Sequence, residues 1–227
     1  MNKNVIAVVI PAYNEERVIG PVVAEVRLYG YMPIVVDDCS RDATAEVARN
    51  AGAEVLRHSR NRDQGAALET GTQYALRQGA EIIVHFDADG QHRIEDIPAL
   101  IEPIINQNKD VVLGSRFLGS AENIRFERRI FLKGAILFTW LFSGIRLTDS
   151  HNGFRAFNRK AATVIRIRER HKAHASEILH EIVRHSLAYA EVPVTIRYTK
   201  YSLARGESSL RRTIGVLKRL FWKNLFH

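Results

Sequence analysis

The sequence predicts a single α/β domain in which helices flank a mostly parallel central sheet. The first 116 of its 227 residues alternate between short runs of β-branched residues and amphipathic stretches, which is the pattern of repeated strand–helix units. A hydrophobic content of 46% with 26% charged residues is typical of an ordinary globular core. Neither a proline- or serine-rich linker nor an internal repeat divides the chain, so one domain is expected.

The elements of the first half can be placed from their side-chain periodicity. Two helical faces repeat apolar residues three and four positions apart, the first at Val18, Ile19, Val22, Val23 and Val26 and the second at Ile94, Ile97, Leu100, Ile101, Ile104 and Ile105. Gly52 and Gly79 stand where helices should end, because glycine readily adopts the left-handed conformation of a C-terminal cap. Strands are expected at residues 5–10, 34–37, 54–58, 81–86 and 110–114.

The second half is less regular. We expect a polar loop at 118–125, an apolar and aromatic helix near 126–144, a turn rich in His, Asn and Gly, two further helices and a strand near 190–198. Residues 209–227 have apolar positions on one side and basic ones around the rest, as in an amphipathic helix that lies on a membrane surface. The chain is therefore divided into a domain at 1–208 and a carboxyl-terminal helix at 209–227.

Charge is distributed unevenly along the chain. Residues 1–113 carry 11 basic and 17 acidic side chains, and residues 114–227 carry 22 and 8, within a net charge of +8. One half therefore suits a cation and the other suits anions, such as a phosphorylated acceptor or an anionic membrane surface. Nucleic acid is not an expected partner, because zinc-finger spacing, an RNP-like strand and a helix-turn-helix pattern are all missing from the sequence.

Sequence features also bear on the compartment. No stretch reaches the roughly 18 uncharged apolar residues of a membrane span, and the amino terminus lacks the features of a signal peptide. The single cysteine, Cys39, cannot form an internal disulfide. We therefore expect a cytoplasmic protein.

An acidic turn follows the fourth expected strand. Asp87 and Asp89 project to the same side of an extended segment, because side chains alternate with a period of two. Two carboxylates this close repel each other unless a cation, a shared proton or solvent intervenes. Mg²⁺ or Mn²⁺ carrying a substrate diphosphate would satisfy this turn, and a solvated acidic loop is the alternative.

Three more polar loops follow expected strands, and the carboxyl ends of parallel strands should bring all four loops to one crevice. In the first of them, Pro11 is expected to end the strand and Asn14 to cap the next helix. The three loops are residues 11–16, 37–40 and 61–66.

Eight motifs, in order along residues 5 to about 210, resemble those of the family-2 glycosyltransferases with the GT-A fold. The most similar subgroup is the polyprenyl-phosphate sugar synthases, typified by dolichyl-phosphate mannose synthase. The motifs are PAYNEE, VVDDCSRDATAEVA, NRDQGAALETG, DADGQH, VVLGSRF, NGFRAF, EVPV and RGESSL.

The resemblance implies a donor site. Its metal-binding positions fall on Asp87, Asp89 and Gln91. Alternatives remain, because Ser40 could cap a helix, Gly65 could be a simple turn residue, and His92 could touch a phosphate or be solvated. The implied nucleotide-sugar-binding residues are Pro11, Ala12, Tyr13, Asn14, Glu15, Asp37, Asp38, Gly65, Asp87 and Arg205.

An acceptor site is implied as well. Ser115, Arg116 and Arg129 would bind the lipid phosphate, although Arg129 and its neighbours Arg125 and Arg128 could equally form a solvated face. Many relatives have lysine where this chain has Ser209, which leaves the diphosphate contact to Arg205. The implied catalytic residues are Asp89, Asp149 and Arg116.

Together these features imply an inverting, metal-dependent transfer of a hexose from a nucleotide sugar, of the GDP-mannose or UDP-glucose type, to dolichyl or undecaprenyl phosphate. The enzyme would be peripheral at the inner, cytosolic face of the membrane, alone or with a membrane-anchoring partner protein. Residues 131–142 and the carboxyl-terminal helix would dock there, unless they pack on the core or on a partner helix. Transfer to a saccharide or another hydroxyl acceptor, with Asp149 as base, is the alternative, and a nucleotide-binding or scaffolding protein without turnover is another.

Overall fold

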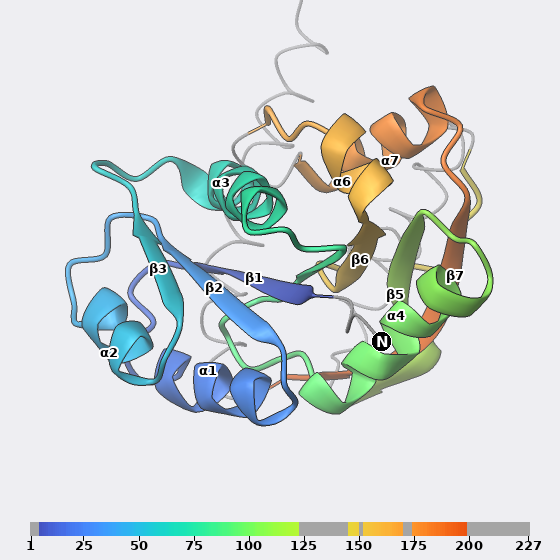
Figure 1. The fold of residues 1–227 in the computed structure, drawn as a ribbon. Coiled ribbons are helices and arrows are strands. Elements are labelled where there is room, and N and C mark those ends of the chain that lie inside the picture. The colour runs from blue at the N-terminus through green and yellow to red at the C-terminus, as the bar shows by residue number, and fades with distance from the viewer. Residues whose placement is uncertain (1–4, 123–144, 150–151, 170–173, 199–227) are drawn as a thin grey trace, which may run out of the picture.

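The computed structural model describes residues 5–122, 145–149, 152–169 and 174–198. These residues form one seven-stranded sheet with the strand order β3-β2-β1-β4-β6-β5-β7 (Figure 1). Its strands are β1 (Ile6–Ala12), β2 (Met32–Asp37), β3 (Glu54–Arg57), β4 (Ile82–His85), β5 (Val111–Glu122), β6 (Arg155–Asn158) and β7 (Tyr189–Arg197).

The sheet is mostly parallel, as predicted. Strands β1, β2, β3 and β4 pair in parallel, and so do β5 and β7, while β6 runs antiparallel between β4 and β5. The prediction of a turn rich in His, Asn and Gly, followed by helices, did not include β6. This strand has only four residues, of which three are buried, so it lacks the alternation that marks a strand with one exposed face.

Helices cover both faces of the sheet and enclose two hydrophobic cores (Figure 1). The helices α1 (Ile19–Leu28), α2 (Thr44–Asn50) and α4 (Ile97–Asn106), with the short 3₁₀ turn η1 (Ile94–Asp96), lie on one face. On the other face lie α3 (Asp63–Arg77), α6 (Arg159–Val164) and α7 (His174–Arg184). Gly52 and Gly79 follow α2 and α3 with φ of 95° and 81°, which confirms the predicted helix ends.

Two predictions about the first polar loops are wrong. Pro11 does not end β1, because the strand continues to Ala12 and Pro11 pairs in register with Val36. Asn14 does not cap α1; its side chain instead accepts a hydrogen bond from the Arg41 backbone N–H at 2.9 Å, and its own N–H donates to Ser40 Oγ. Ser40 likewise caps no helix, so these side chains tie the two loops to each other.

The second half also differs from expectation in part. Strand β5 extends to Glu122 and pairs with β7 beyond a register shift between Ser115 and Ser120, so residues 118–122 are strand and not loop. The strand predicted near 190–198 is β7. The expected aromatic helix near 126–144 and the carboxyl-terminal helix at 209–227 lie outside the described residues.

Asp110 joins three segments at the start of β5. Its buried carboxylate accepts hydrogen bonds from the Ala188 N–H at 2.9 Å, Asn158 Nδ2 at 3.0 Å and Lys160 Nζ at 3.1 Å. Burial alone would raise the pKa of Asp110, but these donors together lower it below its usual value. The charged carboxylate therefore links β5 to β6 and to the turn before β7.

Replacing Asp110 with alanine is expected to lower the free energy of unfolding by about 1–3 kcal/mol, because three partly buried hydrogen bonds lose their acceptor. Urea denaturation measures this change. Glu102→Ala, which removes an exposed carboxylate, is the control and should shift stability by less than about 0.5 kcal/mol. Equal stabilities of the two variants would contradict the role given to Asp110.

Candidate active site

An open pocket of about 280 Å³ lies at the carboxyl edge of β1, β2 and β4, where the polar loops were expected to meet. Of the predicted donor-site residues that the structure describes, Asn14, Asp37, Gly65 and Gln91 are not part of its lining. The lining consists of Pro11, Ala12, Tyr13, Glu15, Asp38, Asn61, Asp63, Gln64, Ala67, Asp87, Ala88 and Asp89. The structure therefore brings the first three loops and the acidic turn together.

The two adjacent aspartates at the end of β2 have different surroundings. Asp37 is fully buried, accepts a hydrogen bond from the Ser40 N–H and lies 3.0 Å from Arg57 Nε. Asp38 lines the pocket. Successive side chains of a strand point to opposite sides, so only one of the pair can face a ligand. Asp37 holds the loop through Ser40 and Arg57, and Asp38 is the aspartate that lines the pocket.

A buried histidine fixes Asp38. Its Oδ1 lies 2.7 Å from His58 Nδ1 and accepts from the Arg62 N–H at 2.8 Å, while His58 Nε2 is 3.0 Å from Thr70 Oγ1. An ionised carboxylate only accepts hydrogen bonds, so we assign the ring proton to Nδ1, and Nε2 then accepts from Thr70. This arrangement leaves Asp38 Oδ2 for a ligand. Sequence reasoning missed His58, which it assigned only to a strand.

The acidic turn holds both of its carboxylates in the pocket wall. Asp87 accepts hydrogen bonds from Gln64 Nε2 at 2.7 Å and from His92 Nε2 at 3.1 Å. Asp89 accepts from the backbone N–H of Gln91 at 3.1 Å and from its side-chain amide at 2.7 Å. Gln91 thus lies beside Asp89 but does not line the pocket.

The two carboxylates differ in pKa. Burial would raise the pKa of Asp87, but the hydrogen bond and charge of His92, with the charges of His174 and Arg155, bring it below its usual value. Burial, together with the charge of Asp87, raises the pKa of Asp89 to about 6. The pair therefore concentrates negative charge that a bound cation would offset.

These residues fit a divalent ion shared with a substrate. Carboxylate and amide oxygens suit Mg²⁺ or Mn²⁺, which usually bind through one or two carboxylates together with water and substrate phosphates. Within the described residues, no cluster of three or more His, Cys, Asp or Glu side chains could form a complete protein cage for a metal. These donors would therefore suit an ion whose remaining coordination positions are filled by water and a substrate diphosphate.

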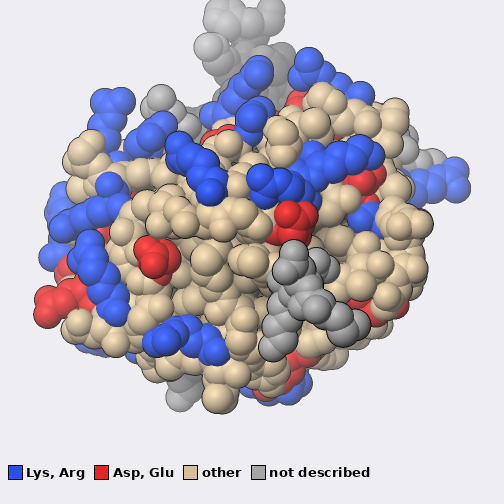
Figure 2. All heavy atoms as spheres, in the orientation of Figure 1, with Lys and Arg blue, Asp and Glu red and all other residues tan. Residues whose placement is uncertain are grey.

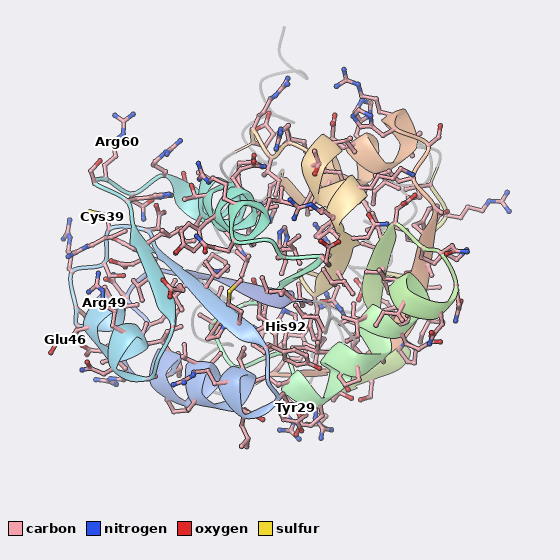
Figure 3. All side chains as sticks on the ribbon, in the orientation of Figure 1. Tyr29, Cys39, Glu46, Arg49, Arg60 and His92 are labelled. Atoms are coloured by element: carbon pink, nitrogen blue, oxygen red, sulfur yellow. The ribbon has the colours of Figure 1, made fainter. Side chains whose placement is uncertain are left out.

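His92 is neither solvated nor in the pocket lining. Its side chain is 3% exposed, and its ring packs against Phe86 and Phe154, with centroids 5.4 and 4.8 Å apart. Figure 3 shows it in the interior, whereas Arg60 and Cys39 are labelled at the periphery.

The antiparallel strand β6 brings the second half of the chain to the same edge. Arg155, its first residue, pairs with His85 of β4 and with Leu113 of β5. Residues 152–154 therefore lie between the acidic turn and the segment that contains Arg116.

Arg116 and Asp149 form a buried ion pair. Arg116 donates to Asp149 Oδ2 from Nε at 2.6 Å and from its backbone N–H at 3.1 Å, and its Nη1 donates to the Tyr198 hydroxyl at 2.6 Å. Both side chains are less than a tenth exposed. Ser115, predicted to bind the acceptor phosphate, is fully buried and its hydroxyl lies 2.6 Å from Thr148 Oγ1, so the structure gives it no surface for a ligand.

Two predicted site residues, Arg129 and Arg205, lie outside the described residues. So do Arg125, Arg128 and Ser209.

The described surface carries much positive charge. Figure 2 shows lysine and arginine side chains spread over α3, α6 and α7 on the upper part of this face, with few acidic side chains between them. Such a surface attracts anionic substrates. In the ranges that the structure describes, no helix is both long enough and apolar enough to cross a bilayer.

Comparisons with known proteins agree with the motifs. The chain matches the model of glycosyl transferase family 2 over residues 7–165. It is 36% identical over 228 residues to the UDP-N-acetylglucosamine–dolichyl-phosphate N-acetylglucosaminyltransferase of Methanococcus voltae, covering 91% of each chain. With the dolichyl-phosphate hexose transferase of Haloferax volcanii it shares 32% identity over 197 residues, covering 85% of this chain and 82% of the relative.

The fold is also that of a solved glycosyltransferase. The glucosyl-3-phosphoglycerate synthase of Mycobacterium tuberculosis, in complex with Mn²⁺ and UDP-glucose, superposes with a TM-score of 0.70 at 20% identity, covering 94% of this chain and 78% of that one. The predicted GT-A fold is thereby confirmed, as is the resemblance to polyprenyl-phosphate sugar transferases. The chain belongs to glycosyl transferase family 2 and is a glycosyltransferase.

Proposed function

We propose that this enzyme transfers one hexose, with inversion, from a nucleotide sugar to a polyprenyl phosphate. One observation carries the proposal: Asp38 and the Asp87–Asp89 pair line the same pocket, so a nucleoside and its diphosphate can be bound together. The relatives from Methanococcus voltae and Haloferax volcanii are named for transfer to dolichyl phosphate, which supports the acceptor class. The donor would be of the GDP-mannose or UDP-glucose type.

Donor binding follows from the pocket. Asp38 Oδ2 would accept from a ribose hydroxyl or from a base N–H. Asp87, Asp89 and Gln91 would hold Mg²⁺ or Mn²⁺. When bound, such an ion offsets the negative charge that grows on the departing diphosphate. Arg205 is proposed to reach the same diphosphate.

The acceptor chemistry depends on Asp149. A phosphate monoester loses its second proton near pH 6, so at neutral pH it is already a nucleophile and needs only to be oriented, here by Arg116. An alcohol would need a base to take its proton. Asp149 Oδ2 already accepts two hydrogen bonds from Arg116, so as a base Asp149 would have to use its other oxygen or give up these bonds. The geometry therefore favours a phosphate acceptor over a hydroxyl acceptor.

The test is to incubate the protein with Mn²⁺ or Mg²⁺, each common nucleotide sugar and a short polyprenyl phosphate, and to seek a glycosylated lipid by mass spectrometry. The matched control is the polyprenol of the same length, which lacks the phosphate. We expect a product only with the phosphate. Transfer to the polyprenol or to a saccharide, with none to the phosphate, would overturn the proposal in favour of a hydroxyl acceptor.

A lipid acceptor further implies that the enzyme works as a peripheral protein at the cytosolic face of the membrane, alone or with an anchoring partner. The same preparation should float with anionic liposomes at low salt, because basic surfaces are attracted to anionic lipids. No flotation at low salt would contradict membrane binding by the chain alone.

A further inference from the structure

Two motifs that lie more than 60 residues apart in the sequence meet at the carboxylate of Asp87. A Cβ atom placed on Gly153 would lie 2.7 Å from Asp87 Oδ2 and 3.3 Å from Asp87 Cγ. A Cβ atom cannot make a hydrogen bond and does not come this close to another heavy atom, so the carboxylate occupies space that any other residue at position 153 would fill. The glycine of the NGFRAF motif therefore leaves the space that the Asp87 carboxylate occupies.

His92 restrains the same carboxylate oxygen from inside the protein. Its Nε2 lies 3.1 Å from Asp87 Oδ2, and because the carboxylate of Asp87 accepts, Nε2 is the donor. The His92 ring packs against Phe86 and Phe154. Its backbone is also fixed, since His92 forms a β-bridge with Ile196. The donor therefore cannot follow Asp87 if the carboxylate rotates.

A buried cation stands nearby. Arg155 is 3% exposed, and its Nε donates to the Asn152 carbonyl oxygen at 3.0 Å, so the guanidinium is anchored to the backbone of the same motif. Burial lowers the pKa of Arg155 to about 10, while the charges of Asp87 and Asp149 oppose that shift, so the group stays charged at neutral pH. This fixed charge favours the ionised form of Asp87.

We propose that Gly153 and His92 are positioning residues for Asp87, and that together they hold its carboxylate in the one orientation in which it can bind a divalent ion. The inference rests on the proposed function of Asp87 as a metal ligand. It assigns Gly153 to the donor-metal side of the site.

Three variants test the inference. Gly153→Ala adds one methyl group, and because the atom that it meets is the end of a side chain, the fold can keep its shape while the Asp87 carboxylate turns away. His92→Leu removes the donor but leaves an apolar side chain between the two phenylalanines. His92→Gln restores a donor. Gly20→Ala is the control, because its methyl group would meet only the Val47 side chain, at 3.0 Å.

The measurement is the dissociation constant of Mn²⁺, from the electron paramagnetic resonance of the free ion, with saturating UDP and in parallel GDP. Gly153→Ala and His92→Leu should each raise it by about 10–100-fold, as replacements behind a metal ligand typically do. His92→Gln should recover most of the affinity, and Gly20→Ala should match the wild type. Nucleotide binding in EDTA should be the same in all variants, which separates a metal effect from damage to the pocket.

A second readout shows whether Gly153 acts through Asp87. The Gly153→Ala change should lower the free energy of unfolding of the wild type. It should change that free energy little in an Asp87→Ala background, where the carboxylate is gone. Wild-type Mn²⁺ affinity in both Gly153→Ala and His92→Leu, or an equal stability cost in both backgrounds, would overturn the inference. Failure of the wild type itself to bind Mn²⁺ with either nucleotide would instead overturn the proposed metal site on which the inference rests.

Discussion

Asp89→Asn should lower kcat for sugar transfer by about 10²–10³-fold, the usual effect of removing one electrostatic contact to a developing charge. Asparagine has the shape of aspartate, and its oxygen can still accept from the Gln91 backbone N–H, while the Gln91 side-chain amide can turn its oxygen toward the new NH2 group. The variant therefore removes a charge from the acidic turn while preserving the turn itself. Initial rates with saturating donor and acceptor measure the effect.

Glu81→Gln provides the matched control for Asp89→Asn. Glu81 is exposed and precedes β4 at the opposite end of the strand from the acidic turn, so the same change of charge and shape is made far from the pocket. Its kcat should equal that of the wild type. A kcat for Asp89→Asn within threefold of the control would contradict the catalytic role of the acidic turn.

Asp149→Asn should lower the stability of the protein strongly and its rate of sugar transfer only slightly. The change leaves the buried Arg116 without its charged partner, which typically costs about 3–5 kcal/mol of unfolding free energy. Transfer to a polyprenyl phosphate, measured at a temperature at which the variant is folded, should fall by less than about tenfold, because an ionised phosphate needs no base. A calorimetric unfolding scan and initial rates give the two quantities.

The charge-neutral double variant, Arg116→Gln with Asp149→Asn, is the control for stability. It should be more stable than the sum of the two single changes implies, since neither charge is then buried alone. A loss of about 10²–10⁴-fold in kcat for fully folded Asp149→Asn would point instead to Asp149 as a base or as an essential positioning residue. Unchanged stability would contradict the ion pair itself.

The parallel part of the fold could be predicted because its signals are local. Strands β1, β2 and β4 and the start of β5 are short apolar runs, and polar side chains follow the strands, so the meeting of these loops at one edge follows from parallel pairing. Strand β6 could not be found in this way. Its position between β4 and β5 depends on long-range pairing, and that pairing is what carries Gly153 to Asp87.

The same distinction applies to the site. Asp38, Asp87 and Asp89 stand in recognisable motifs and line the pocket as predicted. His58 and His92 contact these carboxylates from the interior, and no sequence pattern shows which histidine will be buried against which acid. Asp37, by contrast, was assigned to the site but does not line the pocket, since the sequence could not tell which of two adjacent aspartates points inward.

The central claim is that Asp87 and Asp89 bind a divalent ion that holds the diphosphate of the donor. Its most direct test is the rate of sugar transfer after EDTA treatment, followed as Mn²⁺ is added back, for the wild type and for Asp87→Ala with Asp89→Ala. We predict that the wild type loses activity with EDTA and recovers it with Mn²⁺, while the double variant stays inactive at every concentration. Full activity of the wild type in EDTA, together with full activity of the double variant, would contradict the claim.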